Sequence, residues 1–162
     1  MTVPTQIRSE ASHTDTIGAG KGSYVLLTHL PEEQTIAAGS LSPSLFARGY
    51  YAYVGSALGG FRSRLGRHLR TGKKPRWHID YLLQHASLDA IVICETEHRT
   101  ECVIAQTLAW QFKSVPSFGA SDCRCRSHLF FATDDIMSSV IYTFKSIGLK
   151  PRLKYLRGQS SK

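Results

Sequence analysis

The strongest constraint on the fold is a change of periodicity between residues 54 and 61. Before it lie two β-prone runs, residues 25–28 and 50–54, with turn residues between them. After it, Phe61, Leu65 and Leu69 recur every four residues, which is the spacing of one apolar stripe on a helix. We therefore expect an α/β (α+β) domain, in which a small, mostly antiparallel sheet is flanked by helices.

The rest of the chain alternates between strand and helix patterns. Asp134 as an N-cap and Gly148 after the last turn bound the final helix. Glu101 falls on the core stripe of an earlier helix, where a carboxylate needs a partner or a metal to offset its desolvation. The expected elements after residue 70 are a helix at 77–85, a strand at 88–94, a helix at 100–112, a strand at 128–132 and a helix at 134–147.

Composition sets the domain boundaries. Residues 1–21 are polar and rich in Ser, Thr and Gly, so we expect a disordered leader. Residues 22–148 form the one domain, and residues 149–162 form a basic tail without acids. No apolar run approaches the roughly 18 residues of a membrane helix, and no secretory signal is visible. We expect a cytoplasmic protein with no membrane partner, and the sequence leaves its oligomeric state open.

The charge indicates a polyanionic partner. The chain has 20 Lys and Arg against 12 Asp and Glu, a net charge of +8 at pH 7. The densest cations follow the second β-prone run, with no acid between residues 59 and 79, and arginine favours bidentate phosphate contacts. A solvated helix face is the alternative interpretation. This basic cluster consists of Arg62, Arg64, Arg67, Arg70, Lys73, Lys74 and Arg76.

Two short motifs carry a resemblance to a known family. Residues 22–24 (Gly-Ser-Tyr) and 53–55 (Tyr-Val-Gly) resemble the two signatures of the GIY-YIG endonuclease superfamily. Arg64, His68 one helical turn later and Glu101 in a later helix complete the ordered set.

Two further stretches narrow the resemblance to one branch of that superfamily. Residues 77–82 and 118–130 are similar to hallmark segments of the small, single-domain Uri superfamily endonucleases. The resemblance covers residues 22 to about 131, most of the chain.

The resemblance implies a metal-dependent endonuclease that cleaves DNA, single-stranded or structured forms included. Tyr24 or Tyr53 would activate water, Arg64 would hold the scissile phosphate, and His68 would assist proton transfer. Glu101 would bind one divalent ion, Mg²⁺ or Mn²⁺, at the leaving oxygen. A tyrosine acts as a base only if its pKa of about 10 is lowered, and we expect the basic cluster to lower it.

Each of these residues also has a structural interpretation. Tyr24 and Tyr53 can be packed sheet residues, His68 a surface histidine, and Glu101 a carboxylate that the helix dipole favours. The functional alternative is a module that binds nucleic acid without cleaving it.

The chain departs from the superfamily pattern in two places. Many members carry an asparagine after the glutamate helix, whereas this chain has no Asn, and Ser121 or Asp122 is the polar residue available there. Ser56 stands where some relatives carry a lysine. One phosphate contact is therefore missing or is supplied by Arg62.

A second group of residues has the chemistry of a metal site. Cys123, Cys125 and His128 are ligand types that suit zinc, with Cys102 or His78 as the fourth ligand. One residue separates the two cysteines, whereas zinc fingers usually have about two to four. The alternatives are thiols that only pack, a small zinc-stabilised interaction protein, and a cysteine nucleophile, for which there is no nearby signature.

Overall fold

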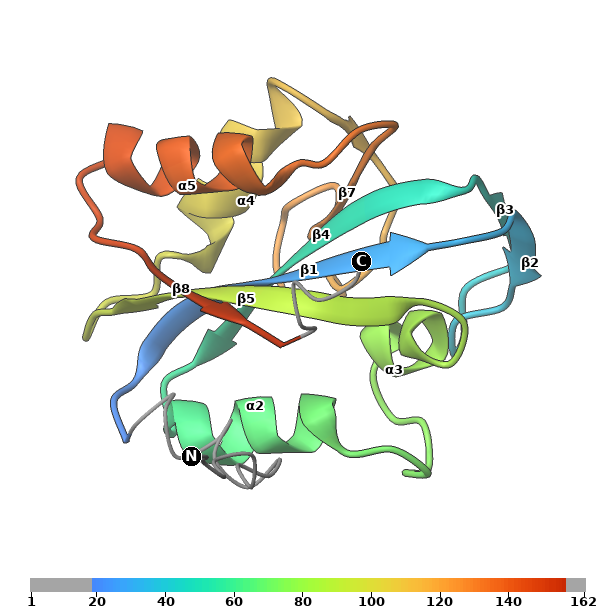
Figure 1. Cartoon of the computed structure of the whole chain (residues 1–162), viewed down its shortest axis with the longest axis horizontal. Helices are drawn as coiled ribbons and strands as arrows, with labels where there is room; N and C mark the ends of the chain where they lie inside the picture. Colours follow the sequence, from blue (N-terminus) through green and yellow to red (C-terminus); the bar gives the residue numbers. More distant parts are fainter. Residues whose placement is uncertain (1–18, 157–162) are drawn as a thin grey trace, which may run out of the picture.

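The structure is a computed structural model, and it describes residues 19–156. Its centre is an antiparallel six-stranded sheet with a separate two-stranded sheet beside it, which confirms the predicted fold class (Figure 1). Across the large sheet the strands are β6 (Lys113–Ser114), β7 (Leu129–Ala132), β4 (Gly49–Ala57), β1 (Gly22–Leu30), β5 (Ser87–Glu95) and β8 (Arg152–Tyr155). The small sheet joins β2 (Gln34–Ile36) and β3 (Ser44–Phe46). The helices are α2 (Phe61–Leu69), α3 (His78–Leu83), α4 (Glu101–Ala109) and α5 (Met137–Ser146).

Strand β1 is the central strand, and this position explains its composition. It pairs with β4 on one side and β5 on the other, and both of its faces are covered, so its apolar run is almost entirely buried. In the register with β4, Tyr24 lies opposite Gly55 and Leu26 lies opposite Tyr53. Directly opposed residues share a face, so both motif tyrosines lie on the same side of the sheet.

The two faces of the sheet have separate cores. Helices α2 and α3 cover one face, where Phe61 and Leu65 pack with Tyr24. Helices α4 and α5 cover the other face, where Leu108 and Phe144 pack against the alternate residues of the same strands. Figure 1 shows this three-layer arrangement, with the sheet between the two helix pairs.

The structure differs from the sequence predictions at several element ends. Residues 152–155, which we expected in the basic tail, form β8 against β5. Asp134 does not cap the last helix, because α5 starts at Met137 and the Asp135 carboxylate accepts the Met137 amide at 2.9 Å. Helix α4 ends at Ala109, and β4 continues beyond Gly55 to Ala57.

The terminal predictions fall largely outside the described residues. These residues begin at 19, so the expected disordered leader is described only over 19–21, where Gly20 and Lys21 accept backbone hydrogen bonds from Phe61 and Thr96. The tail beyond residue 156 also lies outside them. Within residues 19–156, none of the helices has the length and apolar character needed to span a bilayer.

Candidate functional site

A cavity of about 370 Å³ opens where β1 begins and β4 ends. Tyr24, Tyr53, Arg64 and Glu101 line it, which are four of the five predicted catalytic residues. The fifth, His68, is buried behind the wall and joins the group through Tyr24. Residues spread over nearly eighty positions of the chain therefore meet at one end of the sheet.

The first tyrosine is held tightly in place. Tyr24 is only 1% exposed, and its hydroxyl hydrogen-bonds the Nε2 of His68 at 2.7 Å. Its ring lies across Gly55, where even a Cβ atom would overlap the phenol. His68 faces Tyr24 from the last turn of α2, so the helix that carries Arg64 also buttresses the tyrosine.

The expectation that the basic cluster lowers the tyrosine pKa values is wrong. Burial raises the pKa of Tyr53 to about 12, and burial together with the nearby Tyr53 raises the pKa of Tyr24 even further. Arg64 lowers both pKa values, but by less than burial raises them. The same burial lowers the pKa of His68 to about 3, so its imidazole is neutral near pH 7. Both phenols are therefore protonated in the unliganded cavity.

Arg64 is positioned by two contacts. Its Nη1 donates to the carbonyl oxygen of Ser56 at 2.8 Å, and its Cζ lies 4.7 Å from the centre of the Trp77 ring. The Arg67 guanidinium lies 4.6 Å from the same ring and pairs with the buried Asp80 at 2.5 Å. Trp77 thus orients two arginines, a role that the sequence did not reveal.

Glu101 is the first residue of α4, and it is mostly buried, with its side chain 13% exposed. One carboxylate oxygen is 3.4 Å from the exposed Arg99, while the other is buried with no hydrogen-bond partner among the described residues. A hydrogen bond of 2.6 Å between the hydroxyls of Thr100 and Ser23 ties the start of this helix to β1. The helix dipole accounts for a carboxylate in the first turn but not for a buried oxygen without a donor.

The two residues that could replace the asparagine of the superfamily also reach the cavity. Ser121 and Asp122 both line it, and the negative charge of Asp122 contributes to the raised pKa of Tyr53. Gly119 in the same loop has a φ of 70° and packs against the Tyr53 ring. This loop therefore brings a second carboxylate to the wall that Glu101 shares.

Two cations of the basic cluster are engaged within their own segment, and four of its members are exposed to solvent. Arg67 is taken up by Asp80, and the ammonium of Lys73 donates to the carbonyl oxygens of His68 and Arg70, so these two cations stabilise the segment itself. Ser56 and Arg76 line the cavity. The exposed members of the cluster are Arg62, Arg70, Lys74 and Arg76.

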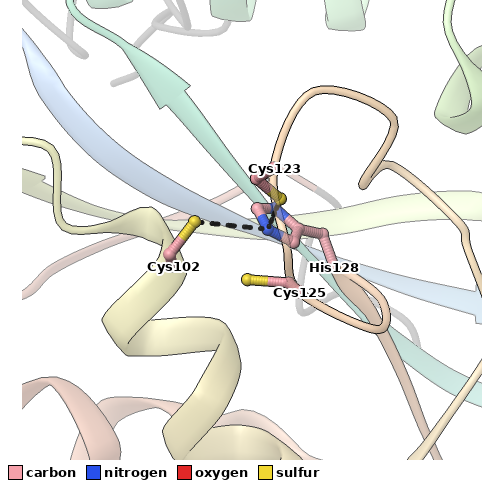
Figure 2. A group of neighbouring side chains, drawn as sticks. All are labelled: Cys102, Cys123, Cys125 and His128. Atoms are coloured by element: carbon pink, nitrogen blue, oxygen red, sulfur yellow. Dashed lines mark hydrogen bonds between the residues drawn. The ribbon is translucent and has the colours of Figure 1, made fainter.

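A second constellation lies beside the cavity. Cys102, Cys123, Cys125 and His128 bring their four ligand atoms within 4.8 Å of one another, a group that could hold a metal ion (Figure 2). Cys102 comes from the first turn of α4 and the other three residues from the loop that leads into β7. Of the two candidates for a fourth ligand, Cys102 joins the group. His78 does not, because its Nδ1 accepts the Gly119 amide at 2.8 Å.

The hydrogen bonds of His128 direct one of its nitrogens at the thiols. Its Nδ1 lies 3.1 Å from the carbonyl oxygen of Val54, so Nδ1 carries the proton and Nε2 presents a lone pair. Nε2 lies 3.4 Å from the sulfur of Cys123 and 3.9 Å from that of Cys102. Burial and the neighbouring thiols raise the pKa of Cys102 to about 12, which keeps it protonated until a cation stabilises the thiolate.

Fold and site together define a class of protein, the small α+β domain with a polar, tyrosine-lined cavity at one end of an antiparallel sheet. Within that class the chain belongs to the family described as domain of unknown function DUF123, whose model matches residues 23–149. The matched segment contains the five predicted catalytic residues and the whole Cys and His cluster. No curated protein and no solved structure matches the chain.

Proposed function

We propose that this protein is an endonuclease that hydrolyses phosphodiester bonds in DNA at the cavity between β1, β4 and α4. The observation that supports the proposal is the convergence of Tyr24, Tyr53, Arg64 and Glu101 on one cavity, with His68 bonded to Tyr24. These residues were selected from the sequence by motif resemblance, so their meeting in space is an independent argument. A group of sheet tyrosines that only pack would not need to share a cavity with a buried carboxylate.

Tyr24 and His68 form a path for the proton of the attacking water. The neutral imidazole can accept the phenolic proton at Nε2 while the Tyr24 oxygen takes a proton from water. The resulting hydroxide attacks phosphorus, the bond to the leaving oxygen breaks, and that oxygen takes a proton from solvent. The relay replaces a free phenolate by an imidazolium, and burial disfavours both charges, so the transfer needs the negative phosphate of the substrate to stabilise the protonated His68.

Arg64 is the residue that would hold the scissile phosphate. Its guanidinium lines the cavity and is oriented by the Ser56 carbonyl and the Trp77 ring before any substrate binds. Prepositioned donors stabilise developing charge better than mobile ones, because no reorganisation is needed during the reaction. Its positive charge also lowers the pKa of both tyrosines, which favours proton removal.

Glu101 suits a divalent cation because one of its oxygens is buried without a donor. The carboxylate is a hard oxygen ligand of the kind that Mg²⁺ and Mn²⁺ prefer, and Asp122 lines the same cavity. When bound, such an ion supplies positive charge at the leaving oxygen. Glu101 would hold it, and the Thr100–Ser23 hydrogen bond would fix the position of Glu101 relative to Tyr24.

The exposed cations extend the proposal to the DNA backbone. Arg76 lies at the cavity, and Arg62, Arg70 and Lys74 are exposed on the same segment. Exposed cations of this kind can contact phosphates and position the strand without reading its sequence. DNA is therefore the proposed substrate, in single-stranded, duplex or branched form.

The test is cleavage of labelled single-stranded, duplex and branched DNA in Mg²⁺ or Mn²⁺. We expect wild type to cleave at least one substrate, and Glu101→Gln and Arg64→Ala to lose about 100-fold or more in rate. Binding, measured in Ca²⁺, should largely persist because the other cations remain. Glu33→Gln and Arg48→Ala are matched controls at exposed positions outside the cavity and should cleave normally.

Two outcomes would overturn the assignment. Binding by the wild type without cleavage of any of the three substrates would favour a non-catalytic nucleic-acid-binding module. Equal loss of binding and cleavage in Arg64→Ala would contradict a catalytic role for that residue.

A further inference from the structure

We infer that Cys102, Cys123, Cys125 and His128 form a tetrahedral zinc site that fixes the start of α4 against the loop before β7. In a tetrahedral site with Zn–S bonds of about 2.3 Å and Zn–N bonds of about 2.0 Å, the sulfurs lie about 3.8 Å apart and sulfur and nitrogen about 3.5 Å apart. The observed sulfur-to-nitrogen distances are 3.4 and 3.9 Å, and no pair of ligand atoms exceeds 4.8 Å. Shifts of an ångström or less therefore complete the coordination.

The loop geometry explains how cysteines separated by one residue can serve together. Cys123 and Cys125 are half-buried, whereas Arg124 and Arg126 between and after them are exposed. In Figure 2 the Cys125 sulfur points toward α4, and the Cys123 sulfur lies beside the His128 ring. The short spacing is thus compatible with two ligands from one loop, with Cys102 completing the set from the helix.

His128 is oriented as metal-binding histidines usually are. Such residues donate their second ring N–H to a carbonyl or carboxylate, which fixes the tautomer and raises the basicity of the ligating nitrogen. Here the Val54 carbonyl oxygen accepts the hydrogen bond from Nδ1 at 3.1 Å. The backbones of the two residues are also paired, because the Val54 amide donates to the His128 carbonyl at 2.9 Å. The ligand is therefore anchored to β4, next to Tyr53.

Ligand chemistry favours zinc over the ion proposed for Glu101. Three thiolates and one neutral imidazole are soft and borderline donors, which suit Zn²⁺ and not Mg²⁺. On binding, the three thiols release their protons to solvent, so the complete site carries a net charge of −1. No change of oxidation state is involved.

The site adjoins the cavity at three points. Cys102 follows Glu101 in the first turn of α4, Cys123 follows Asp122, and His128 itself lines the cavity. A bound zinc would therefore hold both cavity carboxylates in position relative to β4. This consequence for catalysis rests on the proposed function, whereas the zinc site itself does not.

The first experiment measures the metal directly. Purified wild type, reconstituted with zinc sulfate under reducing conditions, should contain about one zinc per chain, and Cys125→Ser should lose most of it. Cys94→Ser is the matched control, because Cys94 is the one cysteine of the chain outside the cluster, and it should keep the zinc. Cobalt substitution should give the strong visible bands of a tetrahedral site and a thiolate charge-transfer band.

A readout on the unmodified chain covers the case in which the variant does not fold. Zinc titrated into reduced, metal-free wild type should protect three thiols from a thiol reagent and release about three protons. Zinc content well below one per chain after reconstitution, an octahedral cobalt spectrum or unprotected thiols would each overturn the inference. A disulfide among these cysteines in protein purified with blocked thiols would do the same.

The effect on Glu101 has its own readout. In folded Cys125→Ser, the Mg²⁺ concentration that half-saturates cleavage should rise about tenfold, while DNA affinity in Ca²⁺ stays constant. An unchanged Mg²⁺ requirement would show that zinc does not position Glu101. A protein that binds one zinc but cleaves nothing would refute the endonuclease proposal alone, and one that cleaves without zinc would refute the zinc site alone.

Discussion

Gly55→Ala should test whether the second motif needs its glycine because Tyr24 lies across it. A Cβ at residue 55 would overlap the Cζ and hydroxyl of Tyr24, and its next contact, to Cε2, would be 2.9 Å. Carbon atoms pack at about 3.5 Å or more, so the phenol must move. Because Tyr24 is 1% exposed, it has little room to do so.

The expected cost has three contributions. Overpacking a core position costs about 1–3 kcal/mol, and loss of the bond between Tyr24 and His68 costs about 1 kcal/mol more. Replacing glycine restricts the unfolded chain and returns about 0.5 kcal/mol. We therefore expect the free energy of unfolding to fall by about 2.5 kcal/mol, which is a shift of about 1.2 M in the urea midpoint for a typical slope near 2 kcal/mol per molar.

Gly59→Ala is the control for this stability measurement. Its added Cβ would meet nothing within 4 Å, so it should leave the urea midpoint unchanged or raise it slightly. The proposed cleavage reaction should also slow in Gly55→Ala, because the displaced Tyr24 loses its alignment with His68. A Gly55→Ala protein as stable as Gly59→Ala would refute the packing argument.

Three further predictions concern charge. Burial lowers the pKa of His68 to about 3, so between about pH 6.5 and pH 3 this histidine is protonated in the unfolded chain but not in the folded one. The free energy of unfolding should therefore decrease as the pH falls through this range. His68→Gln should flatten this pH dependence, measured by urea titration at each pH. Asp80→Asn should cost about 3 kcal/mol in urea unfolding, because it leaves the Arg67 guanidinium without its buried partner, and an unchanged midpoint would count against that pair. The logarithm of duplex DNA affinity should fall with the logarithm of salt by about 0.9 for each phosphate contacted, whereas a flat response would exclude phosphate contacts by the exposed cations.

The sequence predicted the parts of the fold that depend on local patterns. The apolar stripe of residues 61–69 and the β-prone runs near Tyr24 and Tyr53 became α2, β1 and β4, because their periodicities match the faces that they bury. The cavity residues were predicted by motif spacing rather than periodicity. Their convergence follows from the antiparallel pairing of β1 with β4, which aligns the two motifs side by side.

What the sequence missed depends on long-range contacts. Strand β8 is only four residues long, and it becomes a strand because β5 offers an open edge. The pairing of Arg67 could not be predicted without knowing that Asp80 is buried nearby. A run of cations has the same sequence pattern whether its side chains are solvated or paired with acids. The prediction that the tyrosine pKa values are lowered was also wrong, because the charges can be read from the sequence and the burial of the two side chains cannot.

The balance between burial and charge links these findings. Burial fixes the Tyr24 side chain beside His68, and it also raises the pKa of the Tyr24 hydroxyl. The packing that positions this tyrosine therefore also makes it hard to ionise. Arg64 acts against this effect from within the cavity, and it does so from a fixed position because Trp77 and the Ser56 carbonyl orient it. A positive charge held at Glu101 would act in the same direction. The proposed chemistry therefore depends on cations placed around a buried phenol. The elements that fix those cations, including the Cys and His cluster at the start of α4, matter as much as the identity of the base.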